Sequence, residues 1–131
     1  MAVMKPLSDV RVIDLTQAAS GPMCAAHLVA LGAEVLKIEV PGVGDSARRA
    51  GPYLGAKGIA AMNDDPTDIA IFFLKRNRGK KGLTLNLKTP KGLDIFRRLV
   101  AVSDVVLDNY RPGVTQRLGI DYASLSRVKK D

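Results

Sequence analysis

The fold is decided by residues 10–40, which read VRVIDLTQAASGPMCAAHLVALGAEVLKIEV. The β-branched runs at residues 10–15 and 35–40 each predict a strand. Between them, Pro22 is typical of the first turn of a helix and Gly32 is typical of a helix end. A strand, a helix and a second strand in this order predict a parallel pair joined by a right-handed crossover.

The remainder of the chain continues to alternate between strand-like and helix-like segments. Strict alternation of apolar residues predicts a strand at residues 83–87, and a short β-branched run predicts another at residues 105–107. Residues 41–66 are rich in Gly, Pro, Ala and Asp and predict a long loop. Helix-start signals stand at Thr67, Thr89 and Asp121, and a further short helix is expected at residues 114–118, before Gly119.

This order of elements predicts an α/β fold that is Rossmann-like, with a mostly parallel sheet and flanking helices. Four strands leave such a sheet half built, so we expect residues 1–131 to be an incomplete part of a larger domain, with no second domain present. Leu83, Leu85 and Leu87 share one face of a strand near the sheet edge, and that face needs a cover.

Composition places the chain among ordinary globular proteins and favours an anionic partner. Apolar residues make up 47% and charged residues 25% of the 131 residues, and the formal net charge is +7. The lone Cys24 cannot form an internal disulfide, which suggests a reducing, cytoplasmic setting. No apolar run reaches the roughly 18 residues that span a bilayer, so a membrane partner is not expected.

Much of the positive charge gathers in one short stretch, residues 75–81. A solvated basic loop and a nucleic-acid contact both fit such a stretch. Nucleic-acid modules usually add stacking aromatic residues, but here only Phe72 and Phe73 lie nearby, in an apolar run typical of a core. A nucleic-acid partner is therefore disfavoured.

Residues able to carry out catalysis are few. His27 is the only histidine and is interpreted as a core or helix-surface residue. Cys24 falls on the predicted apolar helix face with Leu28 and Leu31, so we expect it to be buried rather than nucleophilic. Asp14 ends the first strand and is interpreted as a structural hydrogen-bonding group.

Metal and dinucleotide sites lack their usual sequence patterns. Asp64 and Asp65 precede a proline and predict a solvated turn, and no metal-ligand spacing occurs in the sequence. Glu39 falls where a ribose-binding acid would stand, but residues 17–22 contain no G-x-G-x-x-G pattern. Neither a metal nor NAD is therefore expected.

In an open α/β sheet, a ligand binds beyond the carboxyl ends of the strands. The segments that follow the four predicted strands are polar, glycine-rich or basic, and they are residues 16–20, 39–46, 85–88 and 108–113. The first of them ends at a helix N-terminus, where free N–H groups favour an anion. We therefore expect an anionic ligand at this edge.

Four stretches of the sequence resemble, in order and at the same spacing, segments of the family III coenzyme A transferases, the CaiB/BaiF type. They read VIDLTQAASGP at residues 12–22, LGAEVLKIEVPGVGD at 31–45, NRGKKGLTLNLK at 77–88 and DVVLDNYRPGVTQRLG at 104–119. The resemblance implies an acyl-CoA transferase that moves coenzyme A (CoA) between an acyl-CoA donor and a carboxylic acid through an aspartyl covalent intermediate. The chain would be the N-terminal, CoA-binding part of the large domain of a roughly 400-residue protein.

The resemblance also implies a CoA site and places no catalytic residue in the chain, because the family aspartate lies beyond Asp131. The implied CoA contacts are Ala19, Ser20, Val40, Leu85, Asn86, Leu87, Lys88, Asn109, Tyr110, Arg111 and Arg117. The family usually has arginine at the position of Val40, so Arg48, Arg49 or another cation would meet the nucleotide instead. Ala19 stands where some members carry a glutamine, which argues against formyl- or oxalyl-type chemistry.

The implied partners are an acyl-CoA, a small carboxylic acid and a second copy of the protein in an interlocked homodimer. The isolated 131 residues would be inactive and poorly soluble or partly folded. Two alternatives stay open. One is an α-methylacyl-CoA racemase, which shares the fold, and the other is a non-catalytic CoA-binding fragment.

Overall fold

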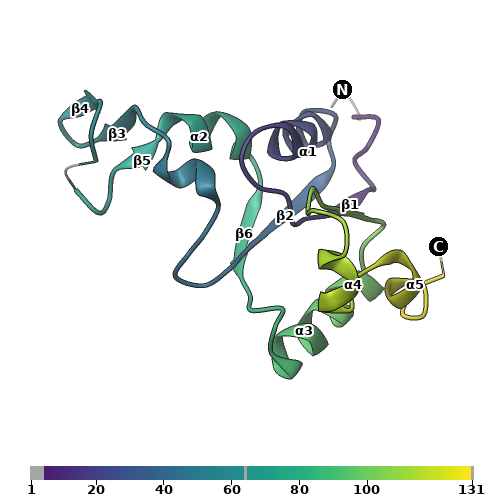
Figure 1. The fold of residues 1–131 in the computed structure, drawn as a ribbon. Coiled ribbons are helices and arrows are strands. Elements are labelled where there is room, and N and C mark those ends of the chain that lie inside the picture. The colour runs from purple at the N-terminus through teal and green to yellow at the C-terminus, as the bar shows by residue number, and fades with distance from the viewer. Residues whose placement is uncertain (1–4, 64, 131) are drawn as a thin grey trace.

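A computed structural model describes residues 5–63 and 65–130 of the chain (Figure 1). Its centre is a four-stranded sheet with the order β6-β2-β1-β7, and all three strand pairs are parallel. The strands are β1 (Arg11–Asp14), β2 (Glu34–Glu39), β6 (Lys81–Thr84) and β7 (Val105–Leu107). The predicted parallel α/β fold is therefore confirmed.

Helices cover both faces of this sheet (Figure 1). Successive residues of β1 point to opposite sides, so each face of the sheet carries apolar side chains that pack against a helix. Val12 packs with Ala25 of α1 (Ser20–Ala30) on one face. Ile13 packs with Phe96 and Val100 of α3 (Pro90–Ala101) on the other face. Two short helices, α4 (Val114–Leu118) and α5 (Tyr122–Leu125), complete the α3 side.

The prediction of a long loop at residues 41–66 is wrong. These residues contain the 3₁₀ helix η1 (Ser46–Arg49) and most of a second sheet, which is three-stranded and antiparallel with the order β4-β3-β5. The strands are β3 (Tyr53–Gly55), β4 (Gly58–Ala60) and β5 (Ile69–Ala70). Strands this short leave no periodic pattern in the sequence.

Two predicted boundaries are also wrong. Helix α2 (Ile71–Asn77) is preceded by Ala70 rather than capped by Thr67, whose hydroxyl instead donates to Asp65 in the turn before β5. Strand β6 ends before Leu85, because the chain there turns towards the cap of α3. Leu85 and Leu87 nevertheless lie buried in the core with Phe96 and Val100, so the cover that their strand face was expected to need is already present within this chain.

The helix face expected to be buried in α1 is shifted by one residue. Cys24 is exposed, whereas Pro22 and Ala25 are the buried residues of the helix. Ala25 packs against Val12 and Val35 in the cluster between α1 and the sheet. His27 is exposed on the helix surface, in agreement with one of the two interpretations of this residue.

The N-terminus of α3 is capped by Thr89, whose Oγ1 accepts a hydrogen bond of 3.1 Å from the N–H of Gly92. We expect Thr89→Ala to lower the free energy of unfolding by about 1 kcal/mol, because that N–H loses its partner. Thr89→Ser keeps the hydroxyl and should stay close to wild type. Urea unfolding of both variants tests this role, and equal midpoints for the alanine and serine variants would contradict it.

Candidate functional site

The segment after β1, residues 16–18, is called the first turn, and it rests on a buried ion pair. Asp14 Oδ2 lies 2.8 Å from Lys80 Nζ, and their side chains are 0% and 1% exposed. Asp14 Oδ1 accepts a hydrogen bond of 2.9 Å from the N–H of Thr16 and another from its hydroxyl. The interpretation of Asp14 as a structural hydrogen-bonding group is therefore confirmed.

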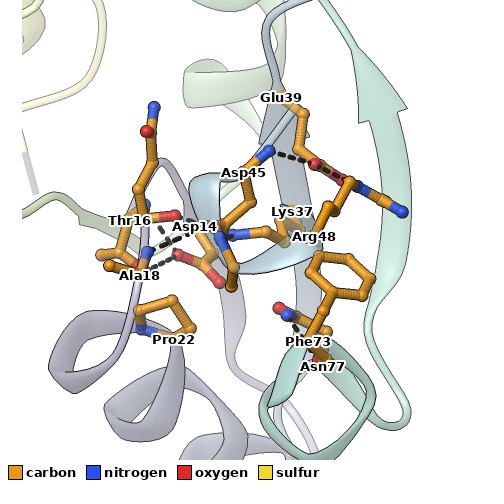
Figure 2. Close-up of polar contacts among 12 residues, drawn as sticks. Asp14, Thr16, Ala18, Pro22, Lys37, Glu39, Asp45, Arg48, Phe73 and Asn77 are labelled. Atoms are coloured by element: carbon orange, nitrogen blue, oxygen red, sulfur yellow. Dashed lines mark hydrogen bonds and ion pairs between the residues drawn. The ribbon is translucent and has the colours of Figure 1, made fainter. Parts of the chain in front are cut away.

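A second buried ion pair, between Lys37 and Asp45, also contacts the first turn (Figure 2). Lys37 Nζ is 2.9 Å from Asp45 Oδ2, and it donates a bond of 2.7 Å to the carbonyl oxygen of Thr16. Asp45 Oδ1 accepts bonds of 2.9 Å from the N–H groups of Ala18 and Ala47. We did not predict this pair, although a lysine inside the apolar run of β2 was a signal for it.

An outer pair joins the end of β2 to η1. Arg48 donates bonds of 2.8 and 2.7 Å to the carboxylate of Glu39, and its guanidinium lies 3.8 Å from the ring centre of Phe73 (Figure 2). Arg49 donates a bond of 2.9 Å to the carbonyl oxygen of Val43. The family usually has arginine at the position of Val40, and Arg48 and Arg49 were proposed to take over its role. Both of these arginines already have protein partners in this structure.

These contacts lower the pKa values of two carboxyl groups. The hydrogen bond from Arg48 is the main cause at Glu39, whose pKa falls below its ordinary value of 4.5. At Asp45, burial alone would raise the pKa, but the N–H groups of Ala18 and Ala47, together with Lys37, outweigh it. The pKa of Asp45 therefore lies below its ordinary value of 3.8.

A carboxyl group with a lowered folded-state pKa stabilises the fold above its unfolded pKa and loses this effect as pH falls through the folded pKa. We therefore expect the melting temperature to fall steadily as pH drops below 4.5. Arg48→Gln should make the fall shallower, because Glu39 then gains less from folding. Arg49→Gln is the matched control and should follow wild type. If the melting temperatures of the two variants depended on pH in the same way, the stabilisation of Glu39 by Arg48 would be contradicted.

An apolar cavity of about 230 Å³ opens beyond the carboxyl ends of β1, β2 and β6. Leu15, Gln17, Ile38, Glu39 and Leu118 form part of its wall. The rest of the wall consists of residues expected in the site from the sequence, which are Val40, Leu85, Asn86, Leu87, Lys88 and Tyr110. The sheet edge thus brings together segments that are far apart in the sequence.

A basic cavity of about 430 Å³ adjoins the apolar one and shares Leu87, Lys88 and Leu118 with it. Arg117, expected in the site, lines this second cavity together with Arg97, which we did not predict. Arg97 lies four residues after Leu93 on α3, and residues at this spacing share one side of a helix. The cavity therefore offers three cationic side chains to an anion.

Four of the expected site residues lie outside both cavities as the described residues form them. Ala19 directly precedes α1 and Ser20 begins it, and both residues are exposed. Asn109 exchanges two hydrogen bonds of 2.9 Å with the backbone of Gln17, and Arg111 is exposed. These residues flank the first turn and the strand end rather than the cavity walls.

Neither a metal cluster nor a membrane span is found in the described part of the chain. Residues 5–63 and 65–130 contain no group of three or more His, Cys, Asp or Glu side chains placed to hold a metal ion. Asp64, half of the acidic pair noted in the sequence, lies outside the described residues. No helix among the described residues is both long enough and apolar enough to cross a bilayer.

The chain is similar over most of its length to proteins of one family. Residues 7–131 match the model of CoA-transferase family III. Succinyl-CoA:glutarate CoA-transferase of Mus musculus is 39% identical over 125 residues, which are 95% of this chain and 26% of that protein. Acetyl-CoA:oxalate CoA-transferase of Acetobacter aceti is 40% identical over 123 residues, 94% of this chain and 28% of that protein. The chain therefore spans about a quarter of the length of these curated relatives.

Solved structures agree with this relationship. The crystal structure of Rv3272 from M. tuberculosis has a TM-score of 0.81 and 38% identity, covering 96% of this chain and 32% of that one. A CAIB/BAIF family protein from Brucella suis has a TM-score of 0.81 and 34% identity, covering 95% of this chain and 31% of that one. The sequence match and the shared fold establish that the chain belongs to CoA-transferase family III.

Proposed function

We propose that this chain is the N-terminal, CoA-binding part of a longer enzyme that moves CoA from an acyl-CoA donor to a carboxylic acid. One observation carries the proposal, namely the adjoining apolar and basic cavities at the carboxyl edge of the sheet. Membership of the family supports it, and so do relatives named as CoA-transferases.

The two cavities match the two halves of CoA chemically. The pantetheine arm is largely apolar and would lie in the cavity walled by Leu85, Leu87 and Tyr110. The phosphates would meet Lys88 and Arg117, because charge-assisted bonds from cations to phosphate oxygens are among the stronger hydrogen bonds. The net charge of +7 also favours the approach of an anionic substrate.

The chemistry would require a nucleophile from outside this chain. We propose that an aspartate attacks the thioester carbonyl of the donor, which gives a mixed anhydride and releases the CoA thiolate. The thiolate then attacks the aspartyl carbonyl, so that an aspartyl-CoA thioester forms and the donor acid leaves. The acceptor carboxylate repeats these steps in reverse order and collects CoA. The residues of this chain would hold CoA while the acyl groups exchange.

A transfer assay on the full-length protein tests the function. The protein would be incubated with succinyl-CoA or acetyl-CoA and a panel of free acids that includes glutarate and oxalate, and new thioesters would be measured by mass spectrometry. Transfer to at least one acid, together with an enzyme adduct trapped by hydroxylamine, is the expected result. Exchange of the α-proton without transfer would instead favour a racemase, and CoA binding without either reaction would favour a non-catalytic fragment.

We also propose that the full-length protein is an interlocked homodimer and that the 131-residue chain alone is inactive and poorly soluble. Apolar side chains left open on the small sheet support this proposal. Leu54 faces Ile59 and Ile69 in the strand registers, and the three are 45%, 69% and 40% exposed. Sedimentation of both forms tests it, and a well-behaved monomeric 131-residue domain that melts cooperatively would overturn it.

A further inference from the structure

The first turn has an unusual backbone conformation. Ala18 has φ of +67°, and among the described residues it is the only one other than glycine with a positive φ. This left-handed region is disfavoured for alanine, because Cβ crowds the neighbouring carbonyl oxygen. A residue keeps such a conformation when its surroundings hold it there, and strained backbone of this kind clusters at functional sites.

Partners from three other segments hold the backbone of this turn. Lys37 Nζ binds the carbonyl oxygen of Thr16, with a distance of 2.7 Å. Asn109 binds both the N–H and the carbonyl oxygen of Gln17, with distances of 2.9 Å. Asp45 Oδ1 binds the N–H of Ala18, also at 2.9 Å. No neighbour in sequence supplies these contacts, so the turn depends on tertiary structure for its shape.

Asp45 occupies the central place among these partners. Its two carboxylate oxygens have different partners. Oδ1 accepts hydrogen bonds from the N–H groups of Ala18 and Ala47, and Oδ2 lies next to Lys37. The N–H of Asp45 donates in turn to Glu39 Oε2 over 2.7 Å (Figure 2). The Asp45 side chain is 0% exposed, whereas Ala18 itself is exposed and its bond to Asp45 is part-buried. Loss of Oδ1 would remove the side-chain acceptor that the N–H of Ala18 has in the folded chain.

The turn matters for the site because Gln17 lines the apolar cavity and α1 begins directly after it. We infer that Asp45 is a positioning residue for CoA binding, because its Oδ1 holds Ala18 in the left-handed conformation that places Gln17 on the cavity wall. The link to CoA rests on the proposed function, whereas the link between Asp45 and the conformation of Ala18 does not.

Two double variants of the full-length protein separate the hydrogen bond from the ion pair. Lys37→Met with Asp45→Asn removes both charges but keeps an oxygen that can accept from Ala18. Lys37→Met with Asp45→Ala removes both charges and the acceptor. Neither variant leaves an unpaired charge in the core, so the two differ in the oxygen that accepts from the N–H groups of Ala18 and Ala47. The conformation of residue 18 reports on the first of these two bonds.

Crystal structures of both variants and calorimetric titration with CoA provide the readouts. The asparagine variant should keep the left-handed conformation at residue 18 and bind CoA within about 3-fold of wild type. The alanine variant should lose that conformation and bind CoA at least about 10-fold more weakly, as expected when a buried contact that shapes the site is lost. Rescue by asparagine is an effect that a general loss of stability would not produce.

Equal CoA affinities in the two variants, or an unchanged residue 18 in the alanine variant, would overturn the inference. If the alanine variant fails to fold, the asparagine variant decides alone, since a loss beyond about 10-fold there would make the charges rather than the hydrogen bond responsible. If wild type binds no CoA, the proposed function fails, and the conformation of residue 18 still decides whether Asp45 holds the turn.

Discussion

Replacing Lys80 by methionine is expected to lower the free energy of unfolding by about 3–5 kcal/mol, because the carboxylate of Asp14 would be left buried without its counter-charge. The two side chains are 1% and 0% exposed, and the ion pair measures 2.8 Å. Lys80 Nζ also donates bonds of 2.9 Å to the carbonyl oxygen of Pro22 and to Asn77 Oδ1. A loss of this size is a large part of the stability of a typical domain, so a protein of low starting stability would be left mostly unfolded.

The neighbouring lysine provides a matched control. Lys81 forms an ion pair of 3.0 Å with Glu34 at the surface, where the side chains are 67% and 50% exposed. Lys81→Met should change the stability by less than about 1 kcal/mol. Chemical unfolding of both variants makes the comparison, and similar midpoints would show that burial of the Asp14 pair has been misjudged. Adding Asp14→Asn to Lys80→Met should recover part of the loss, because no buried charge then lacks a partner.

Replacing Arg117 by alanine should raise the KM for acyl-CoA by about 10- to 100-fold in the full-length protein, because the proposed charge-assisted bond to a phosphate would be lost. The expected effect lies in binding, so kcat should change less than KM. The difference between variant and wild type should also shrink as salt is added, since an exposed cation is screened.

Two adjacent arginines of α3 give this prediction a control within the same helix. Arg97 lines the basic cavity, whereas Arg98 is absent from the lining that the described residues form. Arg97→Ala should weaken acyl-CoA binding in the same direction as Arg117→Ala, and Arg98→Ala should leave it unchanged. Unchanged acyl-CoA kinetics in the Arg117 variant would remove that residue from the proposed site.

Much of the central sheet could be predicted from local sequence patterns. The β-branched runs around Ile13 and Ile38 and the apolar face of α3 around Phe96 all lie in the core, because burial on a strand or helix repeats at a fixed period. The cavity wall could also be anticipated, since the carboxyl ends of parallel strands meet at one edge of the sheet. Tyr110 and Leu85 meet there although they belong to different strand ends.

Other contacts join residues that lie far apart in the sequence, and no local sequence pattern predicts them. Asp14 and Lys80 are 66 positions apart, and Gln17 and Asn109 are 92 apart, so neither contact could be read from a short stretch. The exposed Cys24 shows how a one-residue shift of a helix face changes which side chain is buried. The small antiparallel sheet went unpredicted because its strands contain only two or three residues.

We propose that CoA binds across the carboxyl edge of the sheet, and a crystal structure of the full-length protein with CoA would show where it lies. We expect the pantetheine arm to lie against Leu85, Leu87 and Tyr110, and the phosphates to lie within hydrogen-bond distance of Lys88 and Arg117. CoA bound elsewhere on the protein, with both cavities empty, would contradict it.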